Sequence, residues 1–349
     1  MNKNIKLYFI VLFLMLSFCK VSIAQRSSPY IAKYAGEFLS IGVGGRGLGM
    51  GGAQVAAVND ITSSYWNPAG LAFIDYPQVA LMHEEHFGDL VNYNYGAVGI
   101  PFGTDMSFSI SAIRVAVDGI PDTRTALYDA NNDGVLDILS DRLDYSKITE
   151  FSNSDWAFYF TFAKRQSDNF YWGANVKVLN RNIAEYSALG IGFDLGIIYM
   201  PFANLSLGAN IQDITTTLVS WNTGINELIS PTVKIGSAYR LDIFGFYITP
   251  AFDCDVRFEN RRFASNMNIG FVSFDFHTGL EFSYKNLVYV RGGYNDVKQF
   301  SIGTGIKLPK LNIDYSYAQF NASSYDALPP SHRISLIFTL EEPRHQRDN

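Results

Sequence analysis

The glycine-rich stretch from Ile41 to Ala53, IGVGGRGLGMGGA, has a spacing that could bind a nucleotide. Gly42, Gly44 and Gly47 match the G-x-G-x-x-G pattern that holds a pyrophosphate, and Asp60 follows at about the distance of a ribose-binding acid. That chemistry needs a helix that opens at the third glycine inside a βαβ unit. The glycines after Gly47 would weaken such a helix by roughly 1 kcal/mol each, and no parallel-sheet unit follows. The sequence therefore favours glycines that allow close backbone packing.

The acidic run from Asp129 to Asp137 is a candidate calcium loop. Asp129, Asn131 and Asp133 fall at positions 1, 3 and 5 of the loop pattern, a glycine follows for the turn, and Asp137 falls at position 9. Position 12 is Ser140, so the bidentate glutamate is missing and the predicted affinity is weak, at about 0.1 to 1 mM. The alternative is a solvated acidic turn. No other cofactor is expected.

The sequence predicts no enzyme. Outside the segment that contains His83 and His86, the histidines are His277, His332 and His345, and no serine nucleophile motif of the G-x-S-x-G type accompanies them.

The first 24 residues predict a secretory signal peptide. Lys3 and Lys6 precede an apolar run, which ends in the small-x-small cleavage signal at Ala24. Removing Lys3, Lys6 and Lys20 from the 27 basic residues leaves 24 against 33 acidic ones, which argues against a nucleic-acid partner. Only Cys254 then remains, so no intramolecular disulfide can form.

In much of the chain, apolar residues alternate with small or polar ones, which is the period-two pattern of β-strands. From Leu189 to Tyr199 every second residue is apolar, and the residues between them are mostly glycine. No mature stretch has the 18 consecutive apolar residues of a membrane-spanning helix. Alternation alone also fits a soluble sandwich, but aromatic clusters such as Phe170-Tyr171-Trp172 favour the interfacial girdles of a barrel in a membrane.

We therefore predict an all-β fold, a 14-stranded antiparallel transmembrane β-barrel that contacts outer-membrane lipid. The predicted strands are residues 77–87, 92–101, 106–117, 154–165, 169–182, 188–201, 205–212, 231–240, 245–258, 272–284, 287–294, 299–308, 311–319 and 332–340.

The predicted connections are asymmetric, as in outer-membrane barrels. Segments 102–105, 202–204, 285–286 and 309–310 are short, whereas 118–153, 213–230, 259–271 and 320–331 are long. This pattern predicts that both termini lie in the periplasm of a Gram-negative bacterium. The expected organisation is a signal peptide (1–24), a plug segment (25–75), the barrel (76–340) and a polar tail (341–349).

The plug segment also carries a family resemblance. FLSIGVGGRGLGMGGAQVAAVNDITSSYWNPAGLA, Phe38 to Ala72, resembles the N-terminal signature of the PorV/PorQ family of Bacteroidota, which is itself similar to the FadL-type fatty-acid channels. The glycine block, the acidic residue, the tryptophan and the Asn-Pro-Ala-Gly-Leu run occur in the same order. The motif residues are Gly42, Gly44, Gly47, Gly49, Gly51, Asp60, Trp66, Asn67, Pro68 and Gly70.

The resemblance implies a role in the type IX secretion system. PorV-like members are thought to receive cargo at the translocon through its conserved C-terminal domain, and to deliver it to a surface attachment complex. FadL-like members instead pass hydrophobic small molecules, and the shared motif does not choose between the two. The leading expectation is a secretion component that binds these protein partners, and the alternative is a FadL-like transporter.

Overall fold

The computed structural model describes residues 36–86, 90–131, 134, 139, 141–259, 261, 264–320, 330–342 and 346–347. The predicted signal peptide lies outside this part of the chain. Among the described residues, no helix has the length and apolar character needed to cross a bilayer.

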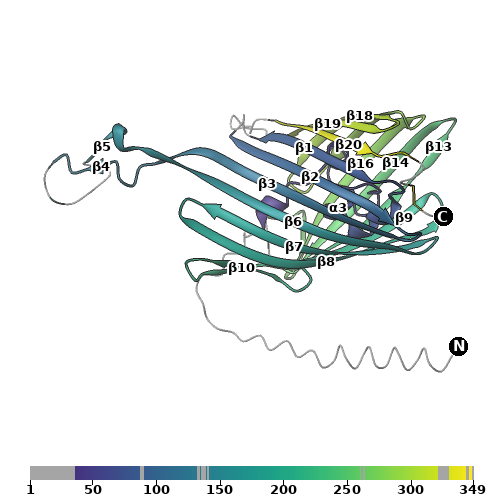
Figure 1. The fold of residues 1–349 in the computed structure, drawn as a ribbon, viewed down its shortest axis with the longest axis horizontal. Helices are drawn as coiled ribbons and strands as arrows, with labels where there is room; N and C mark the ends of the chain where they lie inside the picture. Colours follow the sequence, from purple (N-terminus) through teal and green to yellow (C-terminus); the bar gives the residue numbers. More distant parts are fainter. Residues whose placement is uncertain are drawn as a thin grey trace, which may run out of the picture. The chain divides into compact units, whose positions relative to one another are not determined.

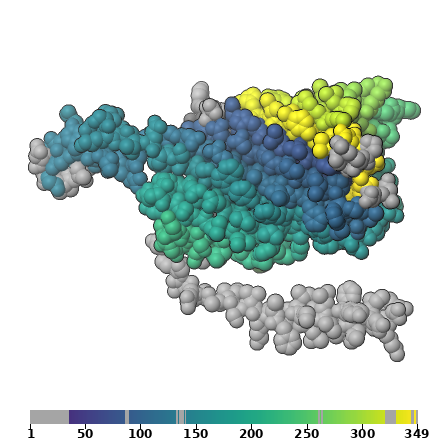
Figure 2. Space-filling view, in the orientation of Figure 1, coloured from purple at the N-terminus to yellow at the C-terminus, as the bar shows by residue number. Residues whose placement is uncertain are grey.

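Fourteen antiparallel strands form a closed barrel, which confirms the predicted fold class. The barrel closes where β20 pairs with β1, from Gln78 opposite Thr339 to Glu85 opposite His332. In Figure 2 the C-terminal strands, in yellow, accordingly lie beside the first strands, in blue. The barrel strands are β1 (Gln78–His86), β2 (Val91–Phe102), β3 (Met106–Asp122), β6 (Thr149–Ser167), β7 (Phe170–Ile183), β8 (Tyr186–Phe202), β9 (Leu205–Gln212), β12 (Thr232–Tyr239), β14 (Phe246–Arg257), β16 (Val272–Tyr284), β17 (Val288–Tyr294), β18 (Gln299–Leu308), β19 (Leu311–Phe320) and β20 (Ser331–Thr339).

The two faces of each strand differ as the alternation predicts. On β8, every second side chain from Leu189 to Tyr199 is apolar, points outward and is 41% to 54% exposed. Asp194, between them, points into the lumen and is buried. Because the outer face is apolar and the inner face is small or polar, the barrel has the surface of a membrane-spanning sheet.

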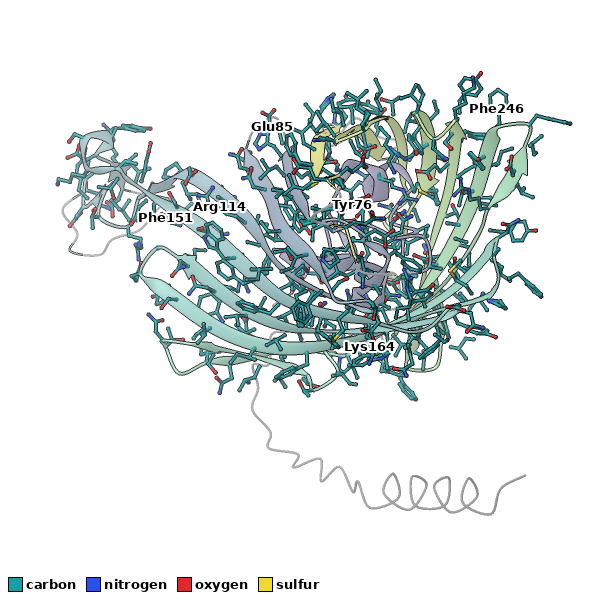
Figure 3. The ribbon with its side chains drawn as sticks, turned by 45° about the vertical axis from the view of Figure 1, so that its right-hand side comes forward. Tyr76, Glu85, Arg114, Phe151, Lys164 and Phe246 are labelled. Atoms are coloured by element: carbon teal, nitrogen blue, oxygen red, sulfur yellow. The ribbon has the colours of Figure 1, made fainter. Side chains whose placement is uncertain are left out.

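The long connections gather at one end of the barrel, which we call the long-loop end, and the tight turns at the other, the short-turn end. Figure 3 marks Glu85 and Phe151 toward the long-loop end, and Lys164 and Phe246 toward the short-turn end. The turns 103–105, 203–204 and 309–310 are as short as the sequence predicts.

The predicted loop 118–153 is largely structured. β3 continues to Asp122 and β6 starts at Thr149, with a bulge between Val117 and Ile120, so the pair runs past the barrel rim (Figure 1). We call residues 118–153 the extension. It also contains β4 (Leu127–Tyr128), β5 (Arg142–Leu143) and η3 (Tyr145–Lys147).

Two other long connections and one connection at the short-turn end also contain short strands, which the alternation did not predict because each has five residues or fewer. The predicted loop 213–230 holds the hairpin of β10 (Thr217–Trp221) and β11 (Asn226–Ile229), and β10 pairs with β8. β15 (Met267–Ile269) pairs with β16, and at the short-turn end β13 (Leu241–Ile243) pairs with β14.

Residues 36–75 cross the lumen as a plug. They form η1 (Glu37–Leu39), α2 (Gly45–Gly49), α3 (Ser63–Trp66) and η2 (Pro68–Phe73). α2 contacts β17 to β20, whereas η2 contacts β3 and β6 to β8 on another part of the wall. Gly36, the first described residue, lines a cavity at the long-loop end, while β20 ends at the short-turn end. The N-terminal residue itself lies outside the described chain, so its predicted periplasmic position stays a prediction.

Candidate functional site

The glycine block has a backbone that only small residues allow. Gly42, Gly44 and Gly51 have φ values of +96°, +79° and +64°, where L side chains are strained. α2 between them is a single short helix of five residues. All barrel pairings are antiparallel, so the βαβ unit that a pyrophosphate site requires is not formed by the described strands.

The glycines instead let the plug backbone touch the barrel wall. A β-carbon on Gly51 would meet the backbone nitrogen of Tyr294 at 2.5 Å, and one on Gly49 would meet the α-carbon of Gly303 at 3.1 Å. A β-carbon on Gly47 would meet the indole of Trp66 at 2.8 Å. Ser301 and His277 bind the buried carbonyl oxygens of Gly49 and Gly51, at 3.2 and 3.0 Å.

The Asn-Pro-Ala-Gly-Leu run forms the second contact with the wall. The amide of the fully buried Asn67 donates to the carbonyl of Val55 at 2.7 Å within the plug and to that of Ile197 on β8 at 3.1 Å. Its oxygen accepts from the backbone of Ala69 at 3.1 Å and so caps η2. Pro68 and Asn67 press against Gly173 and Gly196, where the strands have no side chain.

The remaining motif residues hold the plug together. The indole of Trp66 donates to the carbonyl of Val43 at 2.9 Å. Asp60 accepts from the backbone nitrogen of Thr62 at 2.8 Å and lies 3.9 Å from Arg46. A β-carbon on Gly70 would meet the carbonyl oxygen of Val58 at 2.7 Å. The structure thus brings all ten motif residues into one packed unit.

A charged network, which sequence reasoning missed, ties α2 to the wall. Arg46 lies 3.0 Å from Glu281, Glu281 lies 2.7 Å from Arg291, and Arg291 lies 2.5 Å from Asp314. Arg46 also donates to Asn59 at 2.7 Å. Residue-by-residue alternation along β16 and β19 is enough to place Glu281 and Asp314 on the lumenal face, but nothing in the sequence pairs them with an arginine inside the glycine block.

Further ion pairs join neighbouring strands on the lumenal face of the wall, toward the long-loop end. Lys177 lies 2.9 Å from Asp194 and 2.7 Å from Asp213. Lys234 lies 2.8 Å from Asp255. A second group joins the neighbouring strands β14 and β16 and the loop between them through Arg257, Arg261, Asp275 and His277. These buried charges of opposite sign are therefore paired, as their desolvation requires.

Two cavities lie on either side of the plug. The outer cavity, of about 490 Å³, is at the long-loop end, and the inner cavity, of about 610 Å³, is at the short-turn end. Among the described residues the two have no lining residue in common. The outer cavity has an apolar side of plug and strand residues, namely Leu39, Ile41, Leu48, Trp66, Val91 and Ile229.

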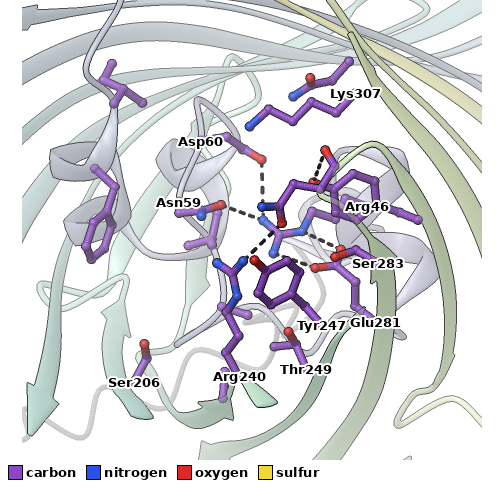
Figure 4. A pocket seen from close by; sticks show the side chains of 18 of the residues that line it. Arg46, Asn59, Asp60, Ser206, Arg240, Tyr247, Thr249, Glu281, Ser283 and Lys307 are labelled. Atoms are coloured by element: carbon purple, nitrogen blue, oxygen red, sulfur yellow. Dashed lines mark hydrogen bonds and ion pairs between the residues drawn. The ribbon is translucent and has the colours of Figure 1, made fainter. Parts of the chain in front are cut away.

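The inner cavity is strongly polar. Figure 4 shows Arg46 and Asp60 of the plug facing Arg240, Tyr247 and Glu281 of the wall. Arg240 stacks on Tyr247 with its guanidinium 3.9 Å from the ring centre. The plug therefore separates a partly apolar chamber from a polar one.

The candidate calcium loop is only partly described, because Asp133 and Asp137 lie outside the described residues. Asp129 accepts from the backbone nitrogen of Gly134 at 2.8 Å, and Asp141 accepts from that of Ala130 at 3.0 Å. The described residues contain no group of three or more acidic, histidine or cysteine side chains that could hold a metal. The calcium site stays a prediction.

An exposed ion pair connects the extension to the neighbouring β7–β8 turn. Arg124 lies 2.7 Å from Glu185 in the turn between β7 and β8. The hydrogen bond from Arg124 holds the pKa of Glu185 below its ordinary value.

The chain matches no protein-family model and no curated protein sequence. Solved structures with the same barrel include the toluene transporter TodX of Pseudomonas putida, with a TM-score of 0.56 and 11% identity over 86% of this chain and 99% of that one. The fold is that of the FadL-type outer-membrane barrels. The Ralstonia pickettii toluene transporter TbuX has a TM-score of 0.53 and 12% identity, over 85% and 98% of the two chains. A Pseudomonas aeruginosa FadL homologue has a TM-score of 0.50 and 13% identity, over 84% and 97%.

These similarities support the FadL-type part of the resemblance. None of them bears on its PorV/PorQ part, so the assignment to type IX secretion stays a prediction.

Proposed function

We propose that this protein is an outer-membrane channel through which hydrophobic small molecules pass. The observation that carries the proposal is the plug, which divides a closed barrel into two cavities that share no described lining residue. A channel of this kind needs a chamber that binds the molecule and a plug that can move to let it pass. TodX and TbuX, which have the same fold, are described as toluene transporters.

The proposed location is the outer membrane of a Gram-negative bacterium, with the long-loop end outside the cell. The apolar outer face supports a lipid environment, because a soluble barrel would lose stability by exposing this surface. The outer cavity then opens toward the medium, and the polar inner cavity toward the periplasm. A molecule without charge would bind against the apolar side of the outer cavity.

A reversible cross-link between plug and wall tests the need for plug movement. Arg46 of the plug and Glu281 of the wall lie 3.0 Å apart, and both line the inner cavity, where a thiol reagent can reach them. In a Cys254→Ala background, cysteines at both positions can be joined by a short reagent that has two thiol-reactive ends and a cleavable disulfide. We expect uptake of radiolabelled toluene or fatty acid by cells to stop on cross-linking and to return when reduction cleaves the reagent. The two single-cysteine variants, treated with the same reagent, are the controls. Equal uptake in the cross-linked and the reduced double variant would refute the channel proposal.

The outer cavity is tested by filling it. Ile41 lines this cavity, whereas Ile225 is exposed in the turn between β10 and β11. We expect Ile41→Trp to reduce uptake at least several-fold and Ile225→Trp to leave it unchanged. Equal effects of the two substitutions would mean that the cavity is not on the path.

Protein docking in type IX secretion is the second candidate function. The observation in its favour is the extension, which presents Tyr145 and Tyr128 at 80% and 43% exposure beyond the barrel rim. Exposed tyrosines are typical of protein-binding surfaces. Translocon or attachment-complex proteins, or cargo C-terminal domains, should then copurify with the tagged barrel and be lost when residues 123–148 are replaced by a short turn. Unchanged secretion after deletion of the gene would exclude this function.

A further inference from the structure

The C-terminal tail contains a buried arginine where the sequence predicts a solvated polar segment. Arg347 is only 4% exposed, although its neighbour Gln346 is exposed. An arginine is buried this deeply only when its donors have partners.

The partners of Arg347 come from the end of the plug and the start of β3. Its guanidinium donates to the carbonyl of Ile74 at 2.8 Å, to that of Met106 at 2.8 Å and to the hydroxyl of Ser107 at 2.5 Å. Its own backbone nitrogen donates to the carbonyl of Asp75 at 2.8 Å. One side chain therefore joins the tail, the plug and the barrel wall.

This junction is at the one covalent link between plug and barrel. η2 ends at Phe73 and β1 begins at Gln78, so residues 74–77 connect them. Carbonyl groups at the end of a helix lack partners within it, and Arg347 supplies them with donors. Ile74 and Asp75 also line the inner cavity, so the junction borders the proposed exit.

The ion pairs of the described tail residues add little to the junction. Lys310 lies 3.9 Å from Glu342, and both side chains are exposed. Asp75 lies 3.8 Å from Arg347, and it is itself more than half exposed. Among the described residues, the hydrogen bonds from the Arg347 guanidinium therefore contribute most to holding Arg347 in the junction.

We propose that Arg347 is a latch, which fastens the end of the plug to β3 and whose release loosens the plug. This regulation rests on the proposed function, since it concerns the same plug. The latch differs from the Arg46 network, which fastens α2 to β16.

Hydrogen exchange of the purified mature barrel in detergent tests the latch without any transport assay. We expect Arg347→Gln to speed amide exchange in residues 68–76 by about tenfold to a hundredfold, because hydrogen bonds from a charged donor shift a local opening equilibrium by that much. Exchange in β7 and β8 should not change. Lys310→Gln, which removes the same charge from the same end, should leave residues 68–76 at the original rate.

Ser107→Ala is the second variant, because it removes one acceptor and leaves the tail intact. A smaller acceleration, confined to residues 68–76, is expected. Unchanged exchange there in both variants, or equal acceleration in all strands, would overturn the latch.

Uptake by cells separates the latch from the channel. Faster exchange together with faster uptake supports both proposals. Faster exchange in a protein that passes no hydrophobic molecule would support the latch and refute the channel, whereas normal exchange with normal uptake would refute only the latch.

Discussion

The plug and the extension are both connections outside the barrel strands, yet different forces hold them in place. In the plug, backbone meets backbone at glycines, and Gly51 and Gly49 lie against Tyr294 and Gly303 of the wall. In the described part of the extension, the strands pair with each other, and an exposed ion pair joins Arg124 to Glu185. The difference teaches that small residues can specify a buried position as firmly as large apolar ones, because they permit close approach.

Of the substitutions predicted here, Gly51→Val should have the largest effect, because it removes the close contact that holds the plug. The side chain would overlap the backbone of Tyr294 and strain a positive φ, which together should cost about 4 kcal/mol in the free energy of unfolding. Protease sensitivity of the plug and urea unfolding measure the loss. Gly103→Val is the matched control, because Gly103 also has a positive φ, but a β-carbon on it would meet no atom within 4 Å. Equal losses would show that backbone strain alone, and not packing on the wall, accounts for the effect.

The same variants test the nucleotide interpretation of the glycine spacing. Nucleotide affinity should be absent in both variants and in the parent.

Arginine on the outer face should sharpen the contrast between barrel and loops. Ile191 on β8 and Ile225 in the β10–β11 turn are 51% and 52% exposed. If both faced water, arginine would have the same small effect on stability at either position. In a bilayer, Ile191→Arg should cost about 3 kcal/mol near the midplane, and Ile225→Arg close to nothing. Urea unfolding in lipid vesicles compares them. Two equal costs would contradict a membrane-spanning barrel.

Removing Arg46 should have an intermediate effect on the plug. Arg46→Gln leaves Glu281 with one arginine partner in a buried site, and we expect a loss of about 2 kcal/mol, since Arg46 is partly exposed. Arg124→Gln, in the exposed pair of the extension, should cost much less, because solvent screens this pair. Urea unfolding of both variants checks the order. A larger loss for Arg124→Gln would reverse the comparison.

Calcium should have the smallest effect, and only on the extension. Calorimetric titration should show a dissociation constant of about 0.1 to 1 mM, with little change in the stability of the barrel. The triple variant Asp129→Asn, Asp133→Asn, Asp137→Asn should lose the binding heat. Absence of heat at millimolar calcium in the parent protein would rule the site out.

The barrel itself was largely predictable, because a strand with one face toward lipid and one toward the lumen must alternate residue by residue. All fourteen predicted segments coincide with barrel strands to within a few residues, except that β3 and β6 run on into the extension. The five-residue β10 was not predictable, because a strand that short carries too little pattern to stand out from a loop.

The contacts of the candidate site were much less predictable. The motif signalled a plug, and the glycines between the apolar residues of β8 were visible in the sequence. That Gly196 makes room for Asn67 could not be read from either segment, because the contact joins residues far apart in the chain. The same holds for Arg347, whose polar neighbours predict a solvated tail.

The sequence by itself determined the strands, their faces and the asymmetry of their connections, since each follows from local periodicity and turn chemistry. Only the tertiary structure decided which buried charges pair, where the plug meets the wall and what the tail binds. Those contacts form because a closed sheet brings residues that are far apart in the chain to one place, and a local sequence pattern does not show which distant residues will meet.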